Sequence, residues 1–266
     1  MTWLQLFLIA VLQGITEFLP ISSSGHLILL PQLTGMPDQG LAIDVAVHVA
    51  TLAAIIVYFL RDVTALTRGG LASLGLVRQR HGGERRWFWY LVAGTVPAVI
   101  VGAAFTALDL SAQFRATHVV ATNLIVYGLI LWVADRWGRE TRAFEDMTLK
   151  DALLVGAAQA LALVPGTSRS GVTMTMARFL GFARPEAARF SFLLSIPAVA
   201  GAGLLVGKDL LEAGAAYQHD ALIAGIMTFF AALAAMAFLM RWLRHASMTI
   251  FVIYRLALGL ALFAFA

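Results

Sequence analysis

The sequence predicts an all-α integral membrane protein with six transmembrane helices and two re-entrant helical hairpins in two inverted-topology repeats. The first observation behind this prediction is composition, because the 266-residue chain is 60% hydrophobic and only 13% charged. A soluble domain carries roughly 25% charged residues, so the composition excludes an ordinary soluble protein. The second observation is that apolar stretches recur along the chain, and the third is that two of them are broken in the middle by polar residues.

Six apolar segments have the length of a membrane span. A spanning helix needs about 20 mostly apolar residues, roughly the hydrocarbon thickness of a bilayer. Two further regions, 3–30 and 152–180, are long enough but contain Pro, Gly, Ser and charged residues in their centres. The six predicted spans are 42–60, 87–108, 118–134, 188–207, 221–240 and 250–266.

The distribution of basic residues orients these spans. Loops 61–86, 135–151 and 241–249, with the stretch after the second broken region, contain fourteen of the 19 Lys and Arg residues and are expected in the cytoplasm. This accounts for the net charge of +4 without a nucleic-acid partner, which we do not expect. The absence of cysteine excludes disulfides and thiolate metal ligands. The loops expected outside, 31–41, 109–117 and 208–220, contain only Arg115 and Lys208.

The charge pattern is consistent only if each broken region enters and leaves the membrane on one face. Each is then a re-entrant hairpin followed by three spans, which inverts the second half relative to the first. Residues 13–25 resemble residues 159–171, as a repeat requires. Paired broken helices in two halves point to a binding site near the membrane midplane. The predicted organisation is a single membrane domain over 1–266, with repeat one at about 1–134, a cytoplasmic connector at 135–151 and repeat two at about 152–266.

The two hairpin tips have the composition of a phosphate cradle. Ser22 to Gly25 and Gly166 to Gly171 are small and rich in hydroxyls, and helix N-termini at such breaks offer free N–H groups to an anion. Arg169 adds a forked, permanently charged donor that suits phosphate. The structural alternative is that the serines cap helix ends and Arg169 merely pairs with Glu17.

Two ionisable side chains in the first hairpin could perform acid–base chemistry. Gln13 and Glu17 are four residues apart and so project from one helical face. The Glu17 carboxylate could hold a divalent cation, act as a general base or orient His26. His26 could be a general acid or base, a nucleophile, or a hydrogen-bonded packing residue.

Two other polar features are predicted near the site. Asp44, His48 and Thr51 form one polar stripe on the span 42–60, with either a structural role or a supporting role behind the site. Arg255, inside the last span, is a second candidate phosphate ligand, or it extends to the interface or pairs with Asp44. Arg178 is expected at the membrane interface.

At these residues the chain closely resembles the undecaprenyl-diphosphate phosphatase family, the bacitracin-resistance membrane proteins. The first family position is Gln13 rather than Glu, which leaves Glu17 as the only carboxylate of its motif and weakens a two-carboxylate metal model. The type 2 phosphatidic acid phosphatases are excluded, because position 175 is Thr rather than His and no Lys-x6-Arg-Pro occurs. The resemblance rests on Gln13 and Glu17, Phe18 to His26, Pro165 to Thr173, Phe190 to Pro197 and Ile253 to Arg255.

The resemblance implies hydrolysis of a C55 polyprenyl diphosphate to the monophosphate carrier lipid used in peptidoglycan synthesis, in the bacterial inner membrane. It implies a divalent cation, Mg²⁺ or Ca²⁺, with Glu17 as a ligand, and a site open to the periplasmic face. A homodimer is compatible with it. Glu17, Ser23, His26 and Arg169 are the expected catalytic residues. The expected substrate-binding residues are Gln13, Ser22, Ser24, Gly25, Gly166, Ser168, Ser170, Thr173 and Arg255.

Two questions stay open from sequence. Either Ser23 or His26 could attack phosphorus, and we favour Ser23 with His26 as its base. The rival function is a transporter or flippase of a polyprenyl phosphate or another anion, because inverted repeats with broken helices are typical of transporters. His26 and Glu17 favour the enzyme, since transport alone needs no acid–base groups.

Overall fold

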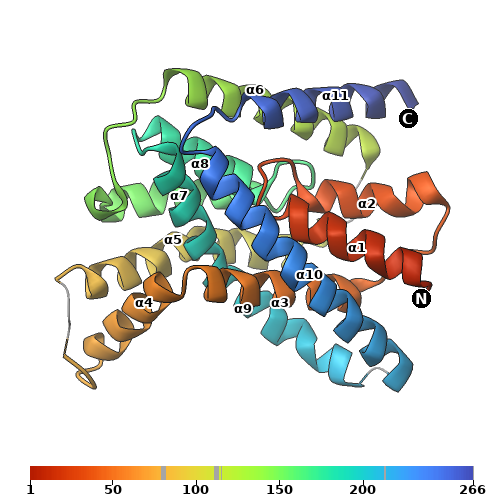
Figure 1. Ribbon diagram of the computed structural model, residues 1–266, viewed down its shortest axis with the longest axis horizontal. Helices are drawn as coiled ribbons and strands as arrows, with labels where there is room; N and C mark the ends of the chain where they lie inside the picture. Colours follow the sequence, from red (N-terminus) through yellow and green to blue (C-terminus); the bar gives the residue numbers. More distant parts are fainter. Residues whose placement is uncertain (79–81, 111–113, 115, 213, 266) are drawn as a thin grey trace.

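The computed structural model of the chain describes residues 1–78, 82–110, 114, 116–212 and 214–265. These residues form helices and no β-strand, which confirms the all-α prediction (Figure 1). A short 3-10 helix, Phe144–Asp146, lies in the connector. The helices are α1 Trp3–Thr16, α2 Ser23–Thr34, α3 Leu41–Tyr58, α4 Leu60–Ser73, α5 Glu84–Ala107, α6 Thr117–Trp137, α7 Leu149–Leu161, α8 Arg169–Phe179, α9 Arg184–Glu212, α10 Ala215–Trp242 and α11 Thr249–Phe265.

Three helices in the described part of the chain are long and apolar enough to cross a membrane. They are α5, α6 and the Tyr217–Trp242 part of α10, and α3 with α4 makes a fourth if that bent pair counts as one span. The chain is therefore a multi-helix membrane protein by length and composition. Each of the six predicted spans coincides with a helix. That all six cross the membrane stays a prediction, because three or four pass the test of length and apolarity.

The loop predicted at 61–86 is wrong in its first part, because Leu60–Ser73 is the helix α4. A bend of 91° separates α4 from α3 at Phe59. The apolar face of α4 packs on α5, and a side chain at Gly69 would meet the backbone of Glu84. Because the opposite face is polar and basic, hydropathy alone gives this segment the signature of a loop.

The chain has the same backbone conformation at the break in each of the two broken regions, as their sequence similarity predicts. Ser22 and Ser168 precede α2 and α8 with φ of 75° and 74°, a left-handed region that non-glycine residues rarely adopt. Each hydroxyl accepts a hydrogen bond from the backbone N–H three residues on, that of Gly25 at 3.3 Å and that of Gly171 at 3.1 Å. Both serines therefore cap a helix, which agrees with the structural alternative for these two residues.

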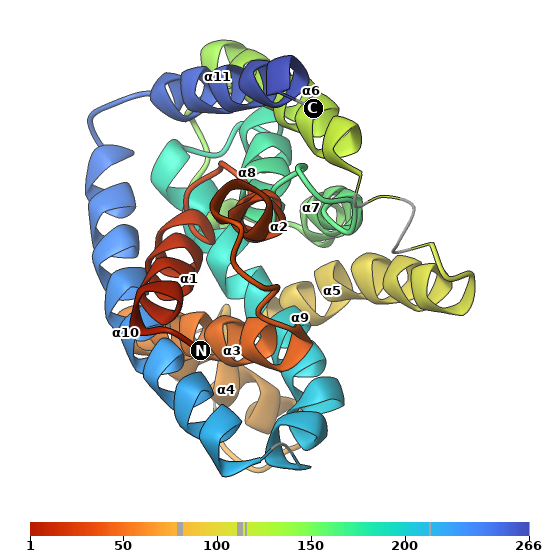
Figure 2. The ribbon, with the colours of Figure 1, turned by 90° about the vertical axis from the view of Figure 1, so that its right-hand side faces the viewer.

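The halves of the chain interlock around these breaks. The first helix of each hairpin packs on a helix of the other half, α1 on α10 and α7 on α5 (Figures 1 and 2). Glycine permits both approaches: a Cβ at Gly14 would lie 2.6 Å from that of Ala231, and one at Gly156 would overlap the backbone of Gly94. The hairpin tips meet in the interior, between the pair α6–α11 and the pair α3–α9.

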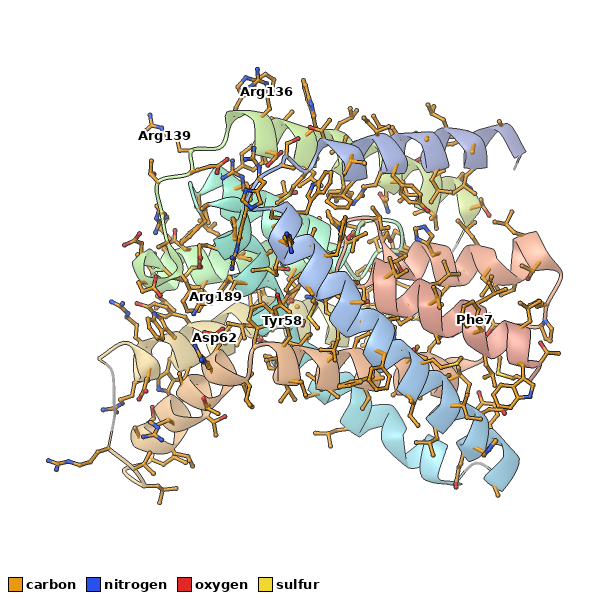
Figure 3. The ribbon with its side chains drawn as sticks, in the orientation of Figure 1. Phe7, Tyr58, Asp62, Arg136, Arg139 and Arg189 are labelled. Atoms are coloured by element: carbon orange, nitrogen blue, oxygen red, sulfur yellow. The ribbon has the colours of Figure 1, made fainter. Side chains whose placement is uncertain are left out.

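An ionic network ties the helix ends on the predicted cytoplasmic side. Arg178, which the sequence predicts near the membrane interface, lies in the last turn of α8, where its fully buried side chain donates to the carbonyls of Gly138 and Phe182. Asp135 accepts from Arg184 Nε at 2.6 Å. A second link joins Arg189 of α9 to Asp62 of α4 at 2.5 Å, and both residues are labelled in Figure 3. In the same view Arg136 and Arg139 project outward from this end.

Candidate active site

Glu17 is the centre of the polar site. It ends α1, and its carboxylate is 7% exposed. Oε1 accepts a hydrogen bond from Arg169 Nη2 at 2.9 Å. Oε2 accepts from Ser23 Oγ at 2.6 Å and from Gln13 Nε2 at 3.1 Å. The structure therefore brings together four predicted site residues that come from both hairpins.

Ser23 is the hydroxyl closest to an acid–base group. It is the first residue of α2, so the N-terminal N–H groups of that helix lie beside it. A distance of 2.6 Å is that of a strong O–H···O⁻ bond, which makes Glu17 the immediate proton acceptor for this hydroxyl. The predicted pairing of Ser23 with His26 as base is replaced in this conformation by the pairing with Glu17.

His26 is held away from the Ser23–Glu17 pair. Its Nδ1 lies 2.7 Å from the carbonyl of Ser22, and because a carbonyl only accepts, Nδ1 carries the proton. Nε2 then accepts from the hydroxyl of Tyr254 at 2.6 Å, and the two rings stack with centroids 5.7 Å apart. Tyr254 is a site residue that the sequence reasoning missed, although it lies in the Ile-Tyr-Arg motif.

Arg169 is fixed at the start of α8 by a second helix. Its Nη1 donates to the carbonyl of Ser191 in α9 at 3.0 Å while Nη2 donates to Glu17. The Ser191 hydroxyl lies 2.6 Å from that of Thr173, a predicted substrate ligand. Ser191 is the second residue that sequence reasoning missed, and its only signal was its position in the Phe-Ser-Phe motif. Three N–H groups of Arg169 remain for a phosphate, since a guanidinium has five.

Arg255 does not reach into the site as the predicted phosphate ligand would. Its fully buried guanidinium donates to backbone carbonyls from three places in the chain. It therefore joins the tips of both hairpins to α6. The five accepting residues are Pro20 in the first tip, Gly166 and Thr167 in the second, and Asn123 and Leu124 in α6, at 3.0–3.1 Å.

The remaining small residues build the tips rather than the centre of the site. The Ser170 hydroxyl donates to the carbonyl of Leu19 at 3.1 Å, and Ser24 lies 3.3 Å from the hydroxyl of Ser22. Gly166 has φ of +85°, and a Cβ there would lie 2.5 Å from the carbonyl oxygen of Val120. A larger residue at Gly166 would push the second tip away from α6.

Asp44 and His48 line the same cavity as Glu17, so they face the site directly instead of supporting it from behind. His48 Nδ1 binds the carbonyl of Asp44 at 2.6 Å, and its Nε2 faces Glu17 Oε2 at 3.7 Å. The cavity, about 390 Å³, is also lined by Arg169. A second cavity of about 210 Å³ is also lined by Asp44 and His48, together with the polar residues Ser24 and Gln39 and with apolar residues such as Leu27.

The donor set fits a cation only if the substrate supplies most of its ligands. The described residues include no group of three or more His, Cys, Asp or Glu that could hold a metal ion. Glu17 already accepts from three donors, so it could give a cation one carboxylate oxygen at most. Mg²⁺ tolerates such a site when phosphate oxygens and water complete its shell.

The fold and the site define an all-helical membrane protein with an internal cluster of carboxylate, hydroxyl and guanidinium groups. The family model described as bacitracin resistance protein BacA matches residues 6–261. The undecaprenyl-diphosphatase of Erythrobacter litoralis is 58% identical over the whole of both chains. Those of Ruegeria pomeroyi and Chromohalobacter salexigens are each 48% identical, covering 100% and 98% of this chain and 99% and 98% of their own. The chain therefore belongs to the BacA family.

Replacing Arg255 by lysine tests its structural role. Arg255→Lys cannot reach five carbonyls, and a buried acceptor left without a donor costs about 1–3 kcal/mol. We expect a lower thermal unfolding midpoint in detergent and a loss of about 2 kcal/mol or more, with the Michaelis constant of the residual folded enzyme little changed. Arg241→Lys, on an exposed position of α10, is the control. A variant that unfolds like the wild type but binds substrate poorly would instead identify Arg255 as a substrate ligand.

Proposed function

We propose that this chain removes the terminal phosphate of undecaprenyl diphosphate, giving undecaprenyl phosphate and inorganic phosphate. The reaction recycles the carrier lipid for cell-wall synthesis, and the family description links it to bacitracin resistance. Membership of the BacA family and similarity to undecaprenyl-diphosphatases support this substrate. The single structural observation that supports the chemistry is the 2.6 Å bond between Ser23 and Glu17, with Arg169 on the other carboxylate oxygen.

The proposed reaction has two steps. Ser23 Oγ attacks the terminal phosphorus as its proton passes to Glu17, and the anhydride P–O bond breaks to release undecaprenyl phosphate. Glu17 gives this proton to the leaving phosphate oxygen, which restores the carboxylate. The carboxylate then deprotonates a water molecule that attacks phosphoserine. The bond between phosphorus and Ser23 Oγ breaks, Glu17 returns the proton to Oγ, and inorganic phosphate is released. Arg169 and the N–H groups at the start of α2 and α8 bind the equatorial oxygens, where charge is stabilised in the transition state.

His48 and His26 have different proposed roles. His48 faces the carboxylate of Glu17 across 3.7 Å, so its Nε2 is placed to exchange a proton between Glu17 and the polar cavity. His26 is a positioning residue, because its ring joins the carbonyl of Ser22 to Tyr254 and so orients the backbone immediately before Ser23.

We propose that a divalent cation, Mg²⁺ or Ca²⁺, enters together with the diphosphate. Glu17 would supply its protein ligand and phosphate oxygens most of the others. The cation would neutralise charge on the diphosphate when bound.

The transporter alternative explains less of this site. A pure transporter needs matched binding groups but no hydroxyl hydrogen-bonded to a carboxylate at 2.6 Å. The matched hairpin tips are compatible with both functions, so they do not decide between them. The Ser23–Glu17 pair favours hydrolysis.

The proposed architecture has six spans, two re-entrant hairpins and inverted repeats, in the bacterial inner membrane with the site open to the periplasm. Three features support it. The two tips share the serine-cap geometry, each hairpin packs on the opposite half, and the polar cavity lies next to the predicted outer loop at Gln39.

Trapping the covalent intermediate identifies the nucleophile. If Ser23 attacks, rapid acid quench during turnover of ³²P-labelled farnesyl diphosphate preserves an acid-stable phosphoserine, found by peptide mass spectrometry. Ser23→Ala removes that adduct and is the control. An acid-labile, base-stable adduct on His26 would reverse the assignment, and absence of any adduct would favour direct attack by water.

Glu17→Gln tests the base and the metal ligand together. Loss of the proton acceptor is expected to lower kcat about 10²- to 10⁴-fold. Glu145→Gln, on a side chain 58% exposed, should be unaffected. If chelator and added Mg²⁺ still change substrate binding in Glu17→Gln as in the wild type, the carboxylate is a base and not a metal ligand. Wild-type turnover in the variant would contradict both roles.

Single cysteines test the topology on a chain that has none of its own. Asp38→Cys and Gly214→Cys are expected to react with an impermeant thiol reagent on intact cells. Gly82→Cys and Glu145→Cys should react only after lysis, because the inverted repeat places them in the cytoplasm. Labelling of positions 38 and 82 from the same side would rule out the arrangement, since one span must separate them.

A further inference from the structure

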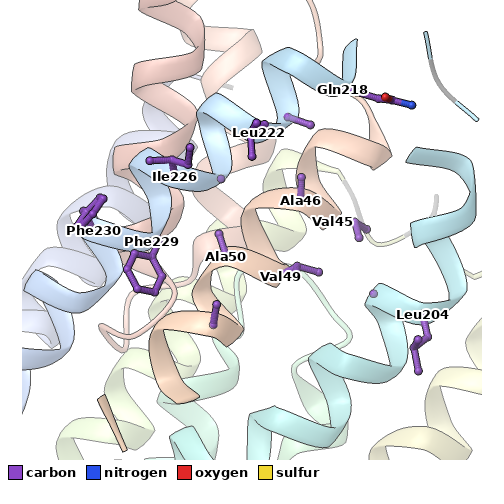
Figure 4. A pocket seen from close by; sticks show the side chains of 14 residues that line it. Val45, Ala46, Val49, Ala50, Leu204, Gln218, Leu222, Ile226, Phe229 and Phe230 are labelled. Carbon is purple, nitrogen blue, oxygen red and sulfur yellow. The ribbon is translucent and has the colours of Figure 1, made fainter. Parts of the chain in front are cut away.

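An apolar groove of about 890 Å³ lies between α3, α9 and α10 (Figure 4). Its volume is in the range of small-molecule binding pockets. Small residues of α3, Ala46 and Ala50, form its floor, and Leu222 and Phe230 of α10 border it. Gln218, at one end, is the polar side chain among its lining residues.

The groove adjoins the cavity that is lined by Glu17 and Arg169. Val45, Val49 and Gly203 line both spaces. A ligand whose head group lies at Glu17 would enter the groove between Val49 and Gly203, which pack closely, since a Cβ on Gly203 would lie 3.0 Å from Val49 Cγ2.

Helix α3 contributes both polar and apolar side chains to the walls of these spaces. Asp44 and His48, four residues apart, line the two cavities around the site, and His48 faces Glu17. Val45 and Val49, each one position further on, line the apolar groove. Because side chains four apart lie on one face of a helix, α3 presents a polar stripe and an apolar stripe side by side. The arrangement matches a ligand with a charged head and an apolar chain.

We propose that the groove binds the prenyl tail of the diphosphate substrate and so determines the preference for long-chain substrates. The proposal rests on the function proposed above. A tail leaving the site at Val49 and Gly203 meets the small residues of α3 before the larger side chains of α10. Gly225 leaves room there, since a Cβ would lie 3.9 Å from that of Ala50.

Two variants that fill the groove test this assignment with substrates of two lengths. Leu222→Trp and Gly225→Leu add volume inside the groove, outside the charged site. Leu260→Trp is a matched control, because Leu260 of α11 and Leu222 are both 62% exposed. The substrates are farnesyl diphosphate, whose fifteen-carbon tail enters the groove, and dimethylallyl diphosphate, whose five-carbon tail ends near the site.

The expected result is a fall of about tenfold in kcat/KM for farnesyl diphosphate in both groove variants, because apolar burial of the tail is lost. Turnover of dimethylallyl diphosphate and all activity of Leu260→Trp should stay at the wild-type level. Equal losses for both substrates would overturn the proposal, as would no loss for either. Displacement of co-purified phospholipid without any kinetic change would assign the groove to ordinary membrane lipid. Failure of the wild type to hydrolyse either diphosphate would instead contradict the proposed function.

Discussion

The guanidinium group of Arg255 holds the two broken helices at a fixed separation, and the geometry of the site depends on this. A helix broken at membrane depth leaves carbonyls without partners, which costs several kcal/mol each in hydrocarbon. Arg255 donates to Pro20 in the first tip and to Gly166 and Thr167 in the second. Ser23 and Arg169 follow those tips by a few residues, so one side chain from the last helix positions the residues that meet at Glu17. The buried charge of Arg255 is thus balanced by the dipoles of five carbonyls, which are its hydrogen-bond acceptors in the described part of the chain.

The second constraint is the charge of Glu17. A buried carboxylate is tolerable only when donors surround it, and Arg169, Ser23 and Gln13 do so here. The same donors suit a phosphate, so in the resting site the carboxylate occupies the place of an anion. In the proposed reaction, transfer of the Ser23 proton to Glu17 would remove the negative charge that holds Arg169. The guanidinium could then bind the phosphoryl group as charge moves onto it, which would couple proton transfer to phosphate binding.

Much of this arrangement is predictable from sequence, because it follows from hydropathy and from residues that break helices. The helices α5 and α6 and the two breaks lie where apolar length and Pro, Gly and Ser place them. The Arg169–Glu17 ion pair, which the sequence offers as the structural alternative to phosphate binding by Arg169, is present at 2.9 Å. Tyr254 and Ser191 could not be predicted, because their partners are distant in sequence or are backbone carbonyls, which carry no residue-type signal. Helix α4 is not predicted for a different reason: its polar face lowers the mean hydropathy of the segment to that of a loop.

The chemistry also explains why the site lies at a boundary between two kinds of space. In the proposed reaction, attack by the Ser23 hydroxyl is favoured where competing water is excluded, whereas release of phosphate from phosphoserine needs water. A lipid diphosphate adds a third requirement, since its tail must stay in apolar surroundings through both steps. Helix α3 satisfies all three with one turn of polar residues, Asp44 and His48, next to Val45 and Val49. A continuous bundle could not place helix N-termini at this depth, so the broken hairpins and the two-faced helix α3 are parts of one solution to the same physical problem.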